Sequence, residues 1–188
     1  LSLIAMKPLE VAGDVRTLLL LLGDQLDERY LVDARVDRGR DAIALCEVAH
    51  ESSHVPSHIQ RTVLLFSSMR HFALQLMCAG WRVHYVPLDA PGNTQSLESE
   101  LSRLLTTLRP QNVCLIHPGE WRVLDSVRKA AAAAGSPHEI LNDTHFLCDL
   151  RWFDDWAATR RVLRLEHFYH EQRRRLNLLV DGDGKPEG

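Results

Sequence analysis

The chain has 188 residues, enough to bury a substantial core as one domain of ordinary size. With 45% hydrophobic and 25% charged residues, the composition excludes an intrinsically disordered chain. A formal net charge of -3 excludes a general electrostatic attraction to nucleic acid, so contact with DNA would need a local basic cluster. Four cysteines stand far apart without metal-site spacing, which predicts free thiols in a reducing, cytoplasmic environment: Cys46, Cys78, Cys114 and Cys148.

Residues 1–17 are predicted to be a leader, because they have neither the basic start and long apolar run of a signal peptide nor a membrane anchor. Five consecutive leucines follow at residues 18–22. They are too few to cross a bilayer and have no helical period, so they predict a strand buried on both faces of a parallel sheet. Gly23 then allows a sharp turn, which leaves Asp24 at the carboxyl end of that strand.

Four more apolar segments alternate with helical patterns. Strands are expected at residues 42–48, 82–88, 112–117 and 138–141, with 27–40 as a charged turn and 49–54 as a loop. Helices are expected from Pro56 to Gly80, from Thr94 or Ser96 to about Leu108, and before Gly135. Strands that alternate with helices and have crossover-length connections predict an α/β fold with a doubly wound, five-stranded parallel sheet.

The pattern changes after residue 142, where two helices are expected at 149–159 and 163–179. We therefore divide the rest of the chain into an α/β domain at 18–145, a helical connector at 146–180 and the start of a linker at 181–188. The connector carries a basic cluster around two aromatic residues: Arg160, Arg161, Arg164, Arg173, Arg174 and Arg175 around Phe168 and Tyr169. A solvated helix face is the favoured explanation, and contact with a DNA backbone is the alternative.

Polar residues follow the predicted strands. The carboxyl ends of parallel strands share one edge of the sheet, where ligands of open α/β sheets bind. The residues expected there are Gly23, Asp24, Gln25, Glu47, His50, Glu51, Asp89, His117, Gly119, Glu120, Asn142 and Asp143. No glycine-rich phosphate-binding sequence accompanies them, so a phosphate-bearing ligand is not expected. Carboxylates and amides accept hydrogen bonds from hydroxyl and ring N–H groups, which favours a polyol or a heterocycle, with merely solvated loop ends as the alternative.

Two weaker patterns lie in the same region. His50, His54 and His58 are spaced four residues apart, which on a helix would align three metal ligands. Because Pro56 places the first two before the predicted helix, no metal site is assigned. The carboxylates of Glu47 and Glu51 could act as a general acid/base pair, but no nucleophile motif accompanies them and no catalytic residue is assigned.

Short sequences in a fixed order give the chain a specific resemblance. They are LGDQL at 22–26, CEVAHE at 46–51, SSMRHFA at 67–73, GWRVHY at 80–85, PGEWRV at 118–123, FLC at 146–148, WAA at 156–158, FY at 168–169, RRR at 173–175, DG at 181–182 and KPEG at 185–188. From residue 18 to the last residue, the sequence resembles the deoxyribodipyrimidine photolyase-related family, which includes iron-sulfur bacterial cryptochromes and (6-4) photolyases.

The resemblance implies a Rossmann-like N-terminal domain that holds an antenna chromophore, typically 6,7-dimethyl-8-ribityllumazine. The chromophore-binding residues that it implies are Gly23, Asp24, Cys46, Glu47, Val48, Ala49, His50, Glu51, Ser52, Ser53, His54 and Glu120. His54 stands where an aromatic residue, commonly Tyr, is expected. FAD, a [4Fe-4S] cluster and the DNA lesion site are expected only in a larger helical domain that follows in the family, so DNA is expected as a partner only of the full-length protein.

The function expected from this resemblance is chromophore binding in a photolyase-related or cryptochrome flavoprotein, in light-dependent DNA repair or blue-light sensing. Two alternatives stay open. One is a non-enzymatic domain that has lost its chromophore and docks on a separate FAD domain. The other is a small-molecule hydrolase or transferase that uses Glu47, Glu51 and Glu120. No membrane partner is expected.

Overall fold

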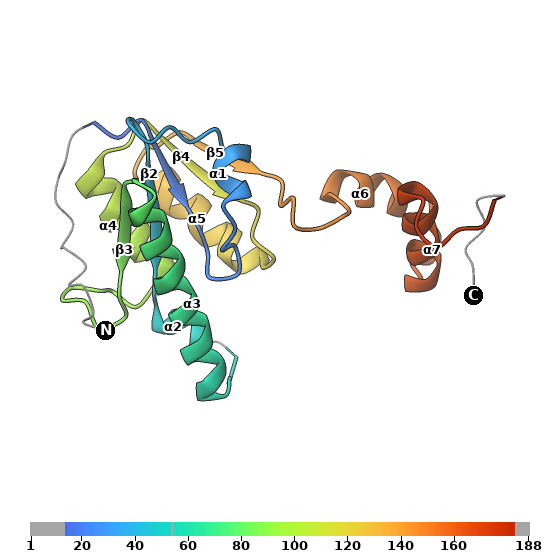
Figure 1. The fold of residues 1–188 in the computed structure, drawn as a ribbon, viewed down its shortest axis with the longest axis horizontal. Coiled ribbons are helices and arrows are strands. Elements are labelled where there is room, and N and C mark those ends of the chain that lie inside the picture. Colours follow the sequence, from blue (N-terminus) through green and yellow to red (C-terminus); the bar gives the residue numbers. More distant parts are fainter. Residues whose placement is uncertain (1–13, 54, 183–188) are drawn as a thin grey trace. The chain divides into compact units, whose positions relative to one another are not determined.

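The computed structural model describes residues 14–53 and 55–182. Most of the predicted leader, His54 and most of the predicted linker lie outside the described residues. The chain divides into two compact units at residues 141 and 142, and each is described by itself (Figure 1). In the described part of the chain, no helix is long and apolar enough to cross a lipid bilayer.

The first unit is built on a five-stranded, all-parallel sheet, as predicted. Its strands are β1 (Thr17–Leu20), β2 (Ala42–Cys46), β3 (Val83–Val86), β4 (Asn112–Ile116) and β5 (His138–Leu141), in the order β3-β2-β1-β4-β5. Leu19 at the centre pairs with Ile43 on one side and with Cys114 on the other. The first three leucines of the run, residues 18–20, thus belong to the central strand, which is buried on both faces of the sheet.

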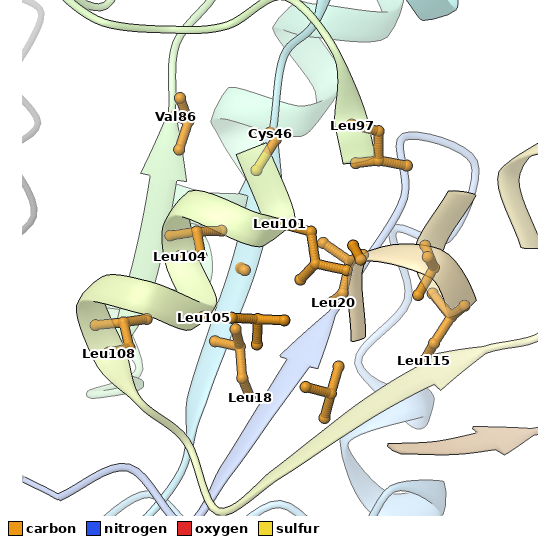
Figure 2. Close-up of a cluster of buried hydrophobic side chains, with 14 of the residues drawn as sticks. Leu18, Leu20, Cys46, Val86, Leu97, Leu101, Leu104, Leu105, Leu108 and Leu115 are labelled. Atoms are coloured by element: carbon orange, nitrogen blue, oxygen red, sulfur yellow. The ribbon is translucent and has the colours of Figure 1, made fainter. Parts of the chain in front are cut away.

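Helices cover both faces of this sheet, because successive strand side chains point to opposite sides. On one face, Leu18 and Leu20 pack with α4 (Leu97–Leu108) and α5 (Trp121–Ala133), and Figure 2 shows the α4 leucines over these two residues. On the other face, Leu19 and Leu21 pack with α1 (Arg29–Asp33) and α3 (Ile59–Cys78). The sheet therefore has the doubly wound architecture that the sequence predicts.

Two short helices differ from the prediction. Helix α1 lies in the segment expected as a charged turn, and α2 (Ala49–Ser53) lies in the segment expected as a loop. Each has five residues, too few to show an amphipathic repeat. Helix α3 begins at Ile59 rather than at Pro56. His58 caps it, since Nδ1 of His58 accepts a hydrogen bond of 3.2 Å from the backbone N–H of Gln60.

The second unit contains α6 (Leu150–Ala158) and α7 (Leu165–Leu176), both within the two predicted helical segments. Asp149 caps α6 by accepting a 2.7 Å hydrogen bond from the backbone N–H of Trp152. The ring of Phe168 lies 6.1, 5.5 and 5.1 Å, centroid to centroid, from three α6 rings: Trp152, Phe153 and Trp156. The two helices of this unit thus pack through their aromatic rings, whereas the ring of Phe146 is exposed.

Candidate ligand-binding edge of the sheet

The carboxyl edge is defined here as the residues that follow β1, β2 and β4: 21–28, 47–53 and 117–120. In the observed strand order, the chain proceeds from β1 to β2 on one side and enters β4 on the other side of β1. The crevice outside such a switch point is where ligands of open α/β sheets bind. The carboxyl edge is therefore the candidate site, and most of the predicted chromophore-binding residues lie on it.

Glu47 lies at this edge, but its carboxylate is fully buried and is hydrogen-bonded only within the protein. Arg70 of α3 donates hydrogen bonds of 2.6 and 2.7 Å to the two carboxylate oxygens. The hydroxyl of Tyr85 and the backbone N–H of Leu88 donate as well, the latter at 2.8 Å. Burial alone would raise the pKa of Glu47, but the hydrogen bonds from Arg70 and Tyr85 outweigh it and lower the pKa. In this structure Glu47 holds β2, β3 and α3 together, and it has no oxygen left for acid/base work.

Cys46 and Val48 flank Glu47 and belong to the core. Burial raises the pKa of the Cys46 thiol to about 12, so this thiol stays protonated and inert. Helix α2 begins at Ala49, and Gln95 accepts hydrogen bonds from its first two backbone N–H groups. Its side-chain oxygen accepts from Ala49 at 3.1 Å, and its carbonyl accepts from His50 at 3.1 Å. These residues shape the turn.

The turns after β2 and β4 are joined by one arginine, in an ion-pair set that we name the Arg122 cluster: Glu51, Glu120 and Arg122. The guanidinium donates to both carboxylate oxygens of Glu51, at 2.8 and 2.9 Å, and to Glu120 at 2.9 Å. Arg122 was not among the predicted site residues. Its place as the second residue of α5 was the available signal, because a cation is unfavourable near the positive N-terminus of a helix unless carboxylates compensate.

The turn after β1 is tied to the end of β4 by Gln25, whose side chain is buried. The Gln25 amide donates to the carbonyls of Ile116 and His117, at 3.2 and 3.4 Å, and its oxygen accepts from the N–H of Leu22. A Cβ atom on Gly23 would lie 3.1 Å from side-chain atoms of Leu65 and Met69, so α3 approaches this turn closely. Gln25 therefore holds the turn after β1 against the end of β4.

Asp24 and Glu120 present exposed carboxylates at the carboxyl edge. Asp24 has no hydrogen bond or ion pair to any residue that the structure describes. His50 is exposed, and its carbonyl accepts from the Ser53 hydroxyl at 3.5 Å. The predicted residue His54 and the side chain of Ser52 lie outside the described part of the structure. Asn142 and Asp143, which were expected at this edge, belong to the second unit.

No group of three metal-ligating side chains gathers anywhere in residues 14–53 and 55–182. In the basic cluster of the second unit, Arg173 is buried and donates to the carbonyls of Leu178 and Leu179. Arg175 lies over the ring of Trp152, 4.9 Å from its centroid. These two arginines therefore stabilise their own unit. Arg160 lies over the ring of Trp156, 5.5 Å from its centroid, and Arg161 and Arg164 are exposed.

Comparison with known proteins decides the family. The family model described as deoxyribodipyrimidine photo-lyase-related protein matches residues 19–188. The chain belongs to this family. It is also 40% identical over 166 residues to a (6-4) photolyase of Agrobacterium fabrum, an alignment that covers 88% of this chain and 33% of the relative. The chain thus spans about one third of the length of that curated photolyase.

The carboxyl edge of this photolyase-related chain fits the chromophore that its resemblance implies. Ribityl hydroxyl groups donate hydrogen bonds, and the exposed carboxylates of Asp24 and Glu120 accept them. The Nε–H of Arg122 is a buried donor without an acceptor among the described residues, and a heterocycle carbonyl is a matching acceptor. These groups suit a neutral heterocycle that carries a polyol chain.

Proposed function

We propose that residues 18–141 form the antenna-chromophore-binding domain of a photolyase-related flavoprotein, with 6,7-dimethyl-8-ribityllumazine as the chromophore. The observation that carries the proposal is the Arg122 cluster, which brings Glu51 and Glu120 from two different strand ends to the switch point of the sheet. In this proposal Asp24 and Glu120 accept from the ribityl hydroxyl groups, while Gly23, Gln25 and residues 46–51 hold the turns in place.

The proposal extends to the role of the whole protein. Bound at the carboxyl edge, the lumazine would supply light absorption and resonance energy transfer to a flavin. We assign FAD, a [4Fe-4S] cluster and DNA contact to the part of a photolyase-related protein that this chain does not cover, because the chain matches only 33% of its relative. The role is light-dependent DNA repair or blue-light sensing in the cytoplasm.

The test is a titration of the purified protein with ribityllumazine, followed by lumazine fluorescence and by calorimetry. We expect saturable binding with one site, weakened about tenfold by Asp24→Ala and by Glu120→Ala, because each removes an acceptor for a hydroxyl group. Asp125→Ala is the matched control, since Asp125 pairs with Lys129 on α5 and lies outside the carboxyl edge. Absence of saturable binding, or equal binding by both edge variants and wild type, would contradict the proposal.

A second candidate is docking on a separate FAD domain, favoured by the exposed apolar side chains of the second unit. Val162, Leu163 and Leu165 are 60%, 56% and 83% exposed in and beside the turn between α6 and α7. Exposed apolar residues next to one another are typical of interaction surfaces. The check is size-exclusion chromatography with light scattering, on the protein mixed with a purified photolyase-related FAD domain. A complex that is lost with Leu163→Ser/Leu165→Ser supports docking. Separate elution of the two wild-type proteins rejects it.

A further inference from the structure

We infer that Gln95, in the loop of residues 87–96 between β3 and α4, is a positioning residue of the carboxyl edge. It holds the first turn of α2, and the position of α2 sets where Glu51 meets Arg122. The inference rests on the proposed function and adds a residue outside both the carboxyl edge and the chromophore-binding residues that the resemblance implies. What Gln95 determines is the fraction of molecules whose edge is ready to bind a ligand.

Gln95 uses three polar groups to join α2 to its own loop. Its side-chain oxygen accepts from the backbone N–H of Ala49 at 3.1 Å, and its carbonyl oxygen accepts from that of His50 at 3.1 Å. Its side-chain amide donates to the carbonyl of Leu88 at 2.8 Å. The first N–H groups of a helix have no partner within the helix, and five residues are too few for a helix to be stable by itself. Gln95 therefore caps α2 from a distant part of the chain.

The backbone of Gln95 has a conformation that is costly for its residue type. Its φ is 63°, in the left-handed region that Gly and Asn adopt more readily than Gln does. The backbone N–H of Gln95 donates to the side-chain oxygen of Asn93 at 2.8 Å. The Asn93 amide in turn donates to the carbonyls of Glu47 and Pro87, both at 2.8 Å. Residues strained in this way cluster at ligand sites, where the surrounding structure enforces them, so the strain indicates a functional position.

Both ends of this loop are anchored by fully buried carboxylates. At its start, the backbone N–H of Leu88 donates to Glu47 at 2.8 Å. At its end, the backbone N–H and the hydroxyl of Thr94 donate to one oxygen of Glu100, at 2.7 and 2.8 Å. Gln95 follows the second anchor directly and is bonded to Leu88 beside the first. The loop is therefore a fixed frame, against which Gln95 can hold α2.

Helix α2 carries Glu51 to the candidate site, where its carboxylate accepts from Arg122 at 2.8 and 2.9 Å. Binding sites work only while their groups are held within about 0.5 Å of the productive geometry. A molecule whose first α2 turn has opened has Glu51 displaced from Arg122 and is not competent to bind. Since apparent affinity falls in proportion to the competent fraction, loss of the Gln95 cap should weaken binding although Gln95 itself does not touch the ligand.

The experiment titrates 6,7-dimethyl-8-ribityllumazine into wild type and three Gln95 variants. Gln95→Asn accepts the left-handed backbone but is one methylene shorter, so its amide does not reach both Ala49 and Leu88. We expect it to bind about tenfold more weakly, with α2 closed in about one molecule in ten. Gln95→Gly accepts the same backbone, lacks the side chain and should behave alike. Gln95→Glu keeps an acceptor for the Ala49 N–H at a helix N-terminus, where a carboxylate is favourable, so it should recover most of the affinity.

Hydrogen exchange of residues 49–53, followed by mass spectrometry, measures the opening of α2. In Gln95→Asn these backbone N–H groups should exchange at least about tenfold faster than in wild type, and saturating lumazine should restore their protection. The matched control is Arg109→Asn. Arg109 has a φ of 47° at the C-cap of α4 and precedes β4, at the opposite edge of the sheet. This variant should keep the wild-type affinity and the wild-type exchange of residues 49–53.

Each outcome decides a separate point. If wild type does not bind the lumazine, the proposed function fails and this inference fails with it. If wild type binds and Gln95→Asn and Gln95→Gly bind equally well, the proposed function stands and the inference is wrong. The inference is also wrong if these variants lose affinity while residues 49–53 keep their protection, or if Gln95→Glu binds as weakly as they do. An equal loss of affinity in Arg109→Asn would overturn it too.

Discussion

Glu47 and Glu51 stand four residues apart after the same strand, and each accepts two hydrogen bonds from one arginine. The side chain of Glu47 is fully buried, whereas that of Glu51 is 28% exposed. Glu47 also receives the Tyr85 hydroxyl and the Leu88 N–H, so its carboxylate is satisfied within the fold. The two Glu–Arg pairs therefore have different roles. The buried pair, Glu47 with Arg70, stabilises the scaffold, whereas the accessible pair, Glu51 with Arg122, places charged groups at the candidate site.

Glu47→Gln tests the buried pair and has the largest expected effect. The amide cannot accept four donors, so the Tyr85 hydroxyl or the Leu88 N–H loses its acceptor, and Arg70 loses its counter-charge. We expect the free energy of unfolding to fall by about 2–4 kcal/mol, measured by urea denaturation. A loss below about 1 kcal/mol would show that this buried pair stabilises the protein no more than an exposed ion pair does.

The stability of the protein should depend on pH through its buried carboxylates. Burial raises the pKa values of Asp41, Glu47 and Glu100, but hydrogen bonds from an arginine together with those from backbone N–H and hydroxyl groups outweigh burial and lower these pKa values below their ordinary values. The unfolded chain therefore takes up protons at a higher pH than the folded protein does. The contribution of these carboxylates to the free energy of unfolding is fully present above their unfolded pKa values. It is lost as pH drops from about 5 through the lowered pKa values of the folded protein. Urea midpoints at pH 7, 5, 4 and 3.5 should show this fall.

Glu47→Gln removes one of those three titrating groups, so its stability should depend less steeply on pH than that of wild type over the same range. Its stability at neutral pH is already lower, and the two curves should approach each other in acid. Parallel curves would mean that the carboxylate of Glu47 does not contribute to the acid sensitivity.

Glu51→Gln tests the accessible pair and should cost less. Both partners are partly hydrated, and Arg122 keeps Glu120 as a counter-ion, so we expect a loss of about 0.5–1 kcal/mol. Molar salt should narrow the difference from wild type, because exposed ion pairs are screened. Urea titrations at low and high salt measure this loss. A salt-independent loss as large as that of Glu47→Gln would mean that Glu51 stabilises the scaffold in the same way as Glu47.

The sequence alone predicts most of the fold because hydrophobic runs report burial directly. The leucine run predicted the central strand, and residues 138–141 were predicted as the strand that the structure contains. Helices α1 and α2 were not predicted, because five residues are too few to show the 3.6-residue hydrophobic period of a helix. The division of labour between Glu47 and Glu51 could not be predicted, since Arg70 lies 23 and Arg122 lies 71 residues away from its carboxylate. Such pairings depend on how strands and helices meet in space.

Glu120→Gln has the smallest expected effect on stability and separates folding from binding most cleanly. This side chain is the most exposed member of the Arg122 cluster and makes no capping bond to α5, so the urea midpoint should not change measurably. Ribityllumazine binding should nevertheless weaken, because an amide is a poorer acceptor than a carboxylate for a hydroxyl group. A loss of stability without a change in binding would place Glu120 with Glu47 as part of the scaffold, and the candidate site would then rest on Asp24.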